Sequence, residues 1–318
     1  MKSLPPRRIA FLRPLRRAAS GALASLLALA AIGAGGCRAP QQTFETPEAA
    51  VDALVEALRP TLDRSKLESV LGPDARAKLP SGDSVADAAD VAEFLRRFDQ
   101  GHRLVAGPED SVVLELGSDR WPFAFPLSER DGRWAFDTEA GVEELANRRI
   151  GRNELSTIQT MLAIVDAQRE YAWTDGDRDG YRQYAARFIS EPGARNGLFW
   201  PTEAGERPSP LGDLIARATE EGYRKDGEGV YHGYRFRMLT AQGPGAPGGA
   251  MNYAVDGRLI GGFAVVAWPA EYDVSGIMTF IVNQDGVVYQ KDLGPQTERI
   301  ARAMQAYDPS GWSWAQSN

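Results

Sequence analysis

Residues that commonly carry catalysis or covalent cross-links are scarce in this chain. Its 318 residues include one cysteine, Cys37, and two histidines, His102 and His232. A lone cysteine excludes an intramolecular disulfide. The histidines are far apart in the chain and neither has a partner histidine at metal-ligand spacing, so we expect both to be structural or exposed. The chain also lacks the Gly-x-Ser-x-Gly motif of a serine nucleophile.

A phosphate-binding loop is missing too. The segment 243–249 reads Gly-Pro-Gly-Ala-Pro-Gly-Gly, but no Gly-Lys-Ser/Thr ending follows it. Its two prolines also lack the backbone N–H groups that hold a phosphate. We interpret this segment as the loop of a β-hairpin.

Long apolar runs are absent except near the N-terminus. Residues 1–17 carry six basic and no acidic side chains, residues 19–32 are rich in Ala and Leu, and small residues precede Cys37. The apolar run is short for a transmembrane helix. A basic region, a short apolar core and small residues at a cleavage site indicate an export signal over residues 1–36.

Cys37 follows the small residues at the place where bacterial lipoproteins are cut and lipidated. The segment resembles their lipobox, although Ala34 stands where leucine is usual. The resemblance implies that a lipid on Cys37 anchors the mature chain, with residues 37–42 as a tether. Arg38 in place of aspartate implies the periplasmic side of the outer membrane. The alternative is an ordinary signal peptide cut near Gly36, which leaves the protein in the periplasm.

Removal of residues 1–36 makes the chain strongly acidic. The remaining 30 basic and 43 acidic residues give a net charge of −13. Such a body repels nucleic acid and anionic lipid headgroups. We therefore expect no nucleic-acid partner, contact with the membrane through the lipid anchor, and an envelope protein as the candidate partner.

Residues 43–141 predict an N-terminal α+β domain. Helical periodicity begins after Thr46, a predicted N-cap, and from His102 the apolar period changes to two. Asp131-Gly132 between two alternating runs predicts a hairpin. This order, helices and then a curved antiparallel sheet, resembles the cone-shaped fold of nuclear transport factor 2 and its relatives, which implies a pocket.

Residues 142–318 predict a second α+β domain. The longest helical pattern covers Val142–Trp173, which we expect Gly151 to divide, and a short helix is predicted for Tyr181–Phe188. Four runs rich in β-branched and aromatic residues alternate with turn residues over 231–294, so they predict an antiparallel meander. We expect the long helix to pack on this meander.

Several segments of the second half carry a family resemblance. They include RRIGRNELSTIQ, DAQREYA, LFWP, YHGYRF, GGFAVVAWPAEY and SGIMTFIVNQDGVVY. Together they resemble a bacterial exported family known only as a domain of unknown function. The resemblance covers Thr43–Tyr307 and implies no activity, substrate or catalytic residue.

A more distant resemblance concerns the fold of the second half. Arg152-Asn153-Glu154 opens a helical stretch that carries Ala-Gln-x-x-Tyr, and strands ending at Pro269 and covering Gly276–Val288 follow. This succession is similar to the globular part of type IV pilin-like and pseudopilin proteins. Pilins carry their assembly helix directly ahead of this part, whereas a whole domain intervenes here, so the resemblance implies the fold and not pilus assembly.

One local motif points to a metal. Asp175, Asp177 and Asp179 alternate before Gly180, as in the first half of a calcium-binding loop between helices. Ala186 holds the twelfth position, so the bidentate glutamate is missing and we expect weak binding. The alternative is an acidic turn. Calcium is the one cofactor that the sequence suggests.

Carboxylates and tryptophans supply two further candidates. Glu271 and Asp273, together with Asp285, are candidates for an acidic site that does acid–base work on sugars. The alternative is a solvated loop. Trp312 and Trp314 follow the predicted meander and are expected to be exposed, where they can stack on sugar rings.

These features favour an α+β lipoprotein of the bacterial envelope that binds or scaffolds rather than catalyses. No catalytic residue is predicted. The first alternative is an envelope glycan hydrolase that uses carboxylates such as Glu271 and Asp273. The second is a calcium-dependent adhesion or assembly module.

The substitution Cys37→Ser tests the anchor. We expect the variant to leave the membrane fraction or to remain unprocessed, because the lipid is attached through the cysteine sulfur. Cell fractionation with immunoblotting measures both effects, and Thr43→Ser, which lies beyond the tether, serves as the control. A membrane fraction that Cys37→Ser leaves unchanged would contradict the anchor.

Overall fold

The computed structural model describes residues 40–73, 75, 79–174, 177, 180–203, 205–223 and 229–315. The predicted export signal and Cys37 lie outside these residues. Within them the chain is an α+β fold of helices and open antiparallel sheets, which confirms the predicted class. None of the described helices combines the length and the apolarity that a membrane span requires.

Three helices begin the described part of the chain. Thr46 caps the first through its side chain, as predicted, and Asp63 and Asp83 cap the other two. A side-chain oxygen at this position accepts hydrogen bonds from N–H groups that have no partner within the helix, so the caps explain where each helix begins. The helices are α1 (Pro47–Leu58), α2 (Arg64–Leu71) and α4 (Ser84–Gln100).

The first sheet packs against these helices. Its path is β1-β2-β4-β5, with β3 paired to β2, and all neighbours are antiparallel. Asp131 and Gly132 join β4 to β5 with the positive φ values (54° and 73°) that a two-residue hairpin needs, so the predicted hairpin is confirmed. The elements are β1 (His102–Ala106), η1 (Pro108–Asp110), β2 (Val112–Leu116), β3 (Trp121–Pro122), β4 (Leu127–Arg130) and β5 (Arg133–Phe136).

A hydrophobic cluster fills the space between this sheet and the helices. Leu54 and Phe94 enter it from the helices, and Leu114, Leu127 and Phe136 enter it from the strands. Such side chains gain roughly 1.5–3 kcal/mol each from full burial. We call residues 43–137, which form this core, the N-terminal lobe.

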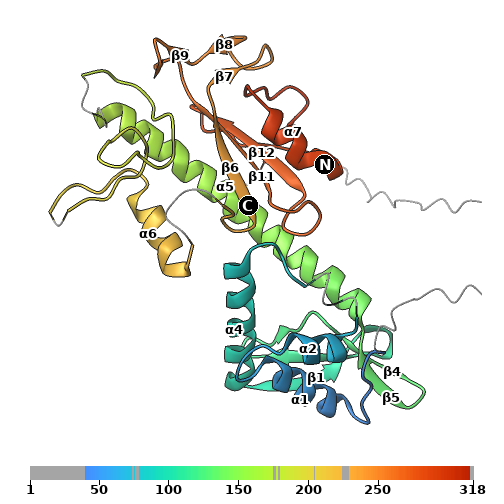
Figure 1. The fold of residues 1–318 in the computed structure, drawn as a ribbon. Helices are drawn as coiled ribbons and strands as arrows, with labels where there is room; N and C mark the ends of the chain where they lie inside the picture. Colours follow the sequence, from blue (N-terminus) through green and yellow to red (C-terminus); the bar gives the residue numbers. More distant parts are fainter. Residues whose placement is uncertain are drawn as a thin grey trace, which may run out of the picture. The chain divides into compact units, whose positions relative to one another are not determined.

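Helix α5 runs without a break over Thr138–Thr174 (Figure 1). The predicted division at Gly151 is therefore wrong. A glycine costs a helix roughly 1 kcal/mol, and the packing on both sides of Gly151 outweighs this cost. Val142 and Leu145 pack against the cluster of the N-terminal lobe, whereas residues from Ile158 onward enter a second cluster. The predicted boundary between two domains falls inside this helix, and that division stays a prediction.

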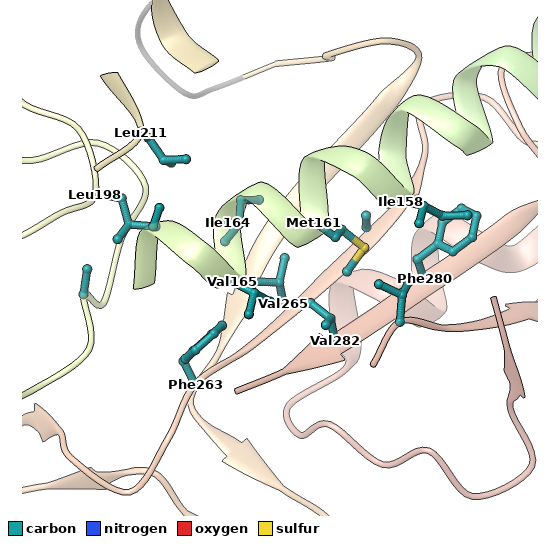
Figure 2. Packing of buried hydrophobic residues seen from close by; sticks show 14 of the residues in the cluster. Ile158, Met161, Ile164, Val165, Leu198, Leu211, Phe263, Val265, Phe280 and Val282 are labelled. Atoms are coloured by element: carbon teal, nitrogen blue, oxygen red, sulfur yellow. The ribbon is translucent and has the colours of Figure 1, made fainter. Parts of the chain in front are cut away.

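The second sheet confirms the predicted meander. Its strands are neighbours in chain order, β6-β11-β12-β13-β14, and all pairs are antiparallel. Figure 2 shows Met161 and Val165 of α5 beside Val265 and Val282 of the sheet, so the long helix packs on the meander as expected. The strands are β6 (Tyr234–Leu239), β11 (Ala264–Pro269), β12 (Met278–Asn283), β13 (Tyr289–Asp292) and β14 (Ser313–Trp314).

The other face of β11 is covered as well. Val265 and Ala267 belong to the cluster with α5, whereas Val266 and Trp268 pack with Ala301 of α7 (Thr297–Ala303). Successive side chains of a strand point to opposite faces. All six residues of β11 are therefore buried, which explains the continuous apolar run in this part of the sequence.

Shorter elements complete the described chain. The segment 243–249 joins β7 to β8, which confirms the predicted hairpin loop. A second short hairpin pairs β9 with β10. These elements are α6 (Gly212–Glu221), β7 (Ala241–Gln242), β8 (Met251–Asn252), β9 (Ala254–Val255), β10 (Arg258–Leu259) and η2 (Gly294–Gln296).

The helix predicted for Tyr181–Phe188 does not form. The buried Gln168 amide of α5 pairs with this segment instead: its Nε2 donates to the Ala185 carbonyl at 2.8 Å, and its Oε1 accepts from the Ala185 N–H at 2.8 Å. Tyr184 forms an isolated bridge with Leu259. These tertiary partners satisfy the backbone in an extended form, so local helical propensity does not decide the outcome.

Replacement of Gln168 by leucine should destabilise the protein by about 2–4 kcal/mol, because both backbone groups of Ala185 lose their partner in a buried place. Urea unfolding followed by circular dichroism measures this. Gln159→Leu, on an exposed position of the same helix, is the matched control and should change the free energy of unfolding by less than about 0.5 kcal/mol. Equal effects of the two variants would contradict this role of Gln168.

Candidate functional site

A cavity of about 570 Å³ lies within the N-terminal lobe, bounded by α1, α2, α4 and the start of α5. Its buried lining includes Leu54, Leu71, Phe94 and Phe125, which are large apolar side chains. The exposed lining residues, which mark its mouth, are Leu62, Arg64, Pro80, Ser84 and Ala88. We call this the lobe cavity.

Local sequence explains why the lobe cavity is apolar. Each bounding helix turns an apolar face inward, and the segment between β3 and β4 contributes Phe123 and Phe125. The mouth retains an apolar character as well, since Leu62 is 39% exposed. The cavity thus combines an apolar interior with a mouth that an apolar molecule can approach.

Arg149 of α5 is the one buried charged side chain in the lining, and it is only 5% exposed. One guanidinium nitrogen, Nη2, donates to the Leu79 carbonyl at 2.6 Å. The buried Nε has no hydrogen-bond partner among the described residues. Burial lowers the pKa of the Arg149 guanidinium, whereas the charges of Asp87 and Asp90 act in the opposite direction.

The neighbouring carboxylates are bound to other groups. Both Asp87 oxygens accept from the Ser81 N–H, at 3.2 and 3.1 Å, and Asp90 forms an ion pair with Arg152 at 2.9 Å. Among the described residues, the Arg149 Nε therefore has no direct acceptor. The lobe cavity therefore contains a charged donor group within apolar surroundings.

A second cavity of about 430 Å³ lies where the start of α4 meets α5, α6 and β6. Its apolar lining includes Ile164, Ile215 and Phe236, and its polar edge is formed by Asp83 and Tyr223. Ser84 lines both cavities, so the first turn of α4 borders each of them.

Asp83 holds this edge together through four hydrogen bonds. Its Oδ1 accepts from the N–H groups of Val85 and Ala86, both at 3.1 Å, and thus caps α4. Its Oδ2 accepts from the Tyr223 hydroxyl at 2.8 Å and from the Gly233 N–H at 3.0 Å. Burial, with a contribution from the Asp83 charge, raises the pKa of Tyr223. A carboxylate with about four acceptor sites is fully used here, so Asp83 is a structural link.

Three consecutive residues of α5 connect it to its surroundings. Arg152 forms an ion pair with Asp90 of α4. Asn153 donates a hydrogen bond to the Ser275 carbonyl at 2.9 Å, and the Glu154 carboxylate accepts hydrogen bonds from the backbone N–H groups of Ile277 at 3.0 Å and Met278 at 2.9 Å. Asn153 and Glu154 thus hold the loop before β12 on the helix, whereas Arg152 connects the helix to α4. Their role is structural.

Comparison with known proteins places the chain in a family. Residues 41–316 match the family model DUF2950, which is described as a protein of unknown function. The chain belongs to this family. Neither the curated proteins nor the solved structures yielded a match. The resemblances to pilin-like proteins and to nuclear transport factor 2 stay predictions.

In this DUF2950 chain the structure separates Asp285 from Glu271 and Asp273, the other two carboxylates proposed for acid–base work. Glu271 and Asp273 precede β12, and Asp285 follows its far end. Six residues of strand at roughly 3.3 Å each span about 20 Å, whereas paired carboxylates of glycosidases lie about 5–9.5 Å apart. Asp285 therefore cannot act together with Glu271.

The calcium motif is described only in part. Asp175 and Asp179 lie outside the described residues, and Asp177 accepts a hydrogen bond from Gln183 Nε2 at 2.7 Å. Within the part of the chain that the structure describes, no group of three His, Cys, Asp or Glu side chains is placed to hold a metal ion. Calcium binding stays a prediction.

The tryptophans and histidines lie at separate places. Trp314 on the edge strand β14 is 62% exposed, whereas Trp312 is partly buried against the cluster around α7. His102 is exposed and stacks on Phe98 with ring centroids 3.7 Å apart. His232 Nε2 lies 3.2 Å from a Glu221 carboxylate oxygen. None of these four residues lines either cavity.

Sequence reasoning missed Arg149, although a signal was present. The buried face of α5 includes Arg149, Asn153, Thr157 and Met161, which follow one another at a spacing of four. Helical periodicity therefore places Arg149 on an inward-facing stripe. A charged residue at such a position needs a partner or has a function, and this is the signal that was available.

The substitution Asp83→Asn should break the link at the second cavity and keep the cap of α4. Asparagine retains one acceptor oxygen for the cap, but its NH₂ group then faces the Tyr223 hydroxyl and the Gly233 N–H, which are both donors. We expect a loss of about 3 kcal/mol in the free energy of unfolding. Asp63→Asn is the matched control: Asp63 caps α2 and uses only Oδ1, so the cost should stay below about 0.5 kcal/mol. Urea unfolding of both variants measures the difference, and equal costs would contradict the link.

Proposed function

We propose that this chain is an exported lipoprotein of the bacterial envelope that binds a small apolar or amphipathic molecule in the lobe cavity. The observation that carries the proposal is the cavity of about 570 Å³ with its apolar interior. Binding pockets for small molecules have volumes of roughly 300–1,000 Å³, are mostly apolar and carry few polar groups. The lobe cavity has this composition.

The energetics of the cavity favour an occupant. A ligand with an apolar surface makes dispersion contacts with the side chains that line the cavity. These contacts add to the free energy of binding that comes from the apolar surface of ligand and protein that binding buries. An apolar mouth, marked by Leu62, allows such a molecule to enter.

The placement of polar groups supports binding rather than catalysis. The lining of the lobe cavity contains no histidine or cysteine, and of its three carboxylates, Glu68, Asp87 and Asp90, the last two are bound by Ser81 and Arg152. The imidazole that most often serves as a general base is therefore missing from this lining. We propose that the protein holds or delivers its ligand.

The location rests on the N-terminal sequence. Residues 1–36 have the features of an export signal, and Cys37 stands at the position of a lipidated cysteine. The mature net charge of −13 disfavours direct contact with anionic headgroups. A lipid on Cys37 would hold the protein on the periplasmic side of the outer membrane.

Fluorescence of the neutral apolar probe N-phenyl-1-naphthylamine tests the proposal. The purified wild-type protein should increase the emission of the probe, and Val91→Trp should reduce this increase, because Val91 lines the cavity and the larger side chain takes up part of its volume. Val55→Trp is the control, since Val55 is also a partly buried helical position but does not line the cavity.

Thermal unfolding of each variant checks that both remain folded. A folded wild-type protein that leaves the probe emission unchanged would overturn the proposal. Equal loss of probe binding in two folded tryptophan variants would overturn the assignment to the lobe cavity.

A further inference from the structure

We infer that the ligand of the lobe cavity is an acyl chain that ends in an oxygen acceptor, and that Arg149 binds this oxygen inside the cavity. The inference rests on the proposed function and names the chemical class of the ligand. Two sources share this chemistry: the carboxylate of a free fatty acid and the ester carbonyl of a lipid.

The first argument is the unsatisfied donor. Arg149 lines the cavity, is 5% exposed, and has a buried Nε without a partner among the described residues. A buried polar group without a hydrogen bond costs free energy, and a charged one costs more. Arg149 makes one hydrogen bond among the described residues, from Nη2 to the Leu79 carbonyl, so an oxygen acceptor that enters the cavity with the ligand gives the charged guanidinium a further partner.

The second argument is location. The Nε atoms of Arg235 and Arg237 are also buried without a partner. Both residues lie on β6 and neither lines the lobe cavity. Among these three arginines, Arg149 alone combines the unsatisfied donor with an adjoining space of the size that a small molecule needs.

The third argument concerns the shape and charge of the ligand. Most of the lining consists of Leu, Val and Phe side chains, which fit a hydrocarbon chain, and its other charged residues are Arg64, Glu68, Asp87 and Asp90. The charges of Asp87, Asp90 and Glu271 act on Arg149 and oppose the entry of a multiply charged anion. A single acceptor, either a carboxylate or a carbonyl, is therefore favoured over a phosphate group.

Competition between N-phenyl-1-naphthylamine and three unlabelled compounds tests the inference on the full chain, which is kept soluble in the same amphipathic polymer for every variant. Laurate carries a carboxylate, methyl laurate carries an ester carbonyl, and dodecane carries no oxygen. In the wild type we expect one or both oxygen-containing compounds to displace the probe at about tenfold lower concentration than dodecane, since a hydrogen bond to a charged donor is worth roughly this factor. Preference for laurate indicates a free fatty acid, and preference for methyl laurate indicates an ester.

Arg149→Met should remove this preference while the probe and dodecane still bind. Arg96→Met is the matched control, because Arg96 is an exposed residue of α4 that does not line the cavity, and the preference should persist in it. Persistence of the preference in Arg149→Met, or its equal loss in both variants, would overturn the role of Arg149.

A second measurement needs only the wild type. In protein labelled with ¹⁵N at arginine Nε, one Nε–H signal should shift with laurate or methyl laurate but not with dodecane. If no signal shifts, or if all three compounds displace the probe equally, the acyl-oxygen inference fails and the binding function stands. If the wild type binds no probe, the proposed function fails.

Discussion

The inward face of α5 is the constraint on which the rest of the structure depends. One helix of 37 residues contributes side chains to two hydrophobic clusters, first through Val142 and Leu145 and then from Ile158 onward. Between these apolar stretches the helix carries polar side chains, and Arg149, Asn153 and Glu154 bind the backbone of neighbouring segments. A change in the rotation of this helix would therefore disturb both cores.

The polar middle of α5 connects the helix to loops and to α4. Arg152 pairs with Asp90, Asn153 binds the Ser275 carbonyl, and Glu154 caps two N–H groups at the start of β12. Polar groups that find their partners in one arrangement favour it, since any other arrangement leaves them unpaired. Two buried groups of this stretch have no partner in the described chain, the Arg149 Nε and the Thr157 hydroxyl. Of these two residues, Arg149 lines the lobe cavity.

Local features were predictable where local physics decides. The Asp131-Gly132 hairpin follows from positive φ angles that these residues tolerate, and the meander follows from alternating apolar runs separated by turn residues. The two wrong predictions concern segments whose outcome depends on distant partners. Packing on both sides of Gly151 keeps α5 continuous, and the Gln168 amide holds Ala185 in an extended segment.

The sequence by itself determined the α+β class and the acidic charge, and it predicted the export signal. Composition, apolar periodicity and turn residues carry this information, because each can be read from a few neighbouring positions. Only the tertiary structure decided the candidate site. Leu54, Phe94 and Arg149 are far apart in the chain and line one cavity, whereas Glu271 and Asp285 are close in the chain and lie at opposite ends of β12. The reason is physical: a cavity forms where elements distant in sequence pack, and no local pattern specifies which surfaces will meet.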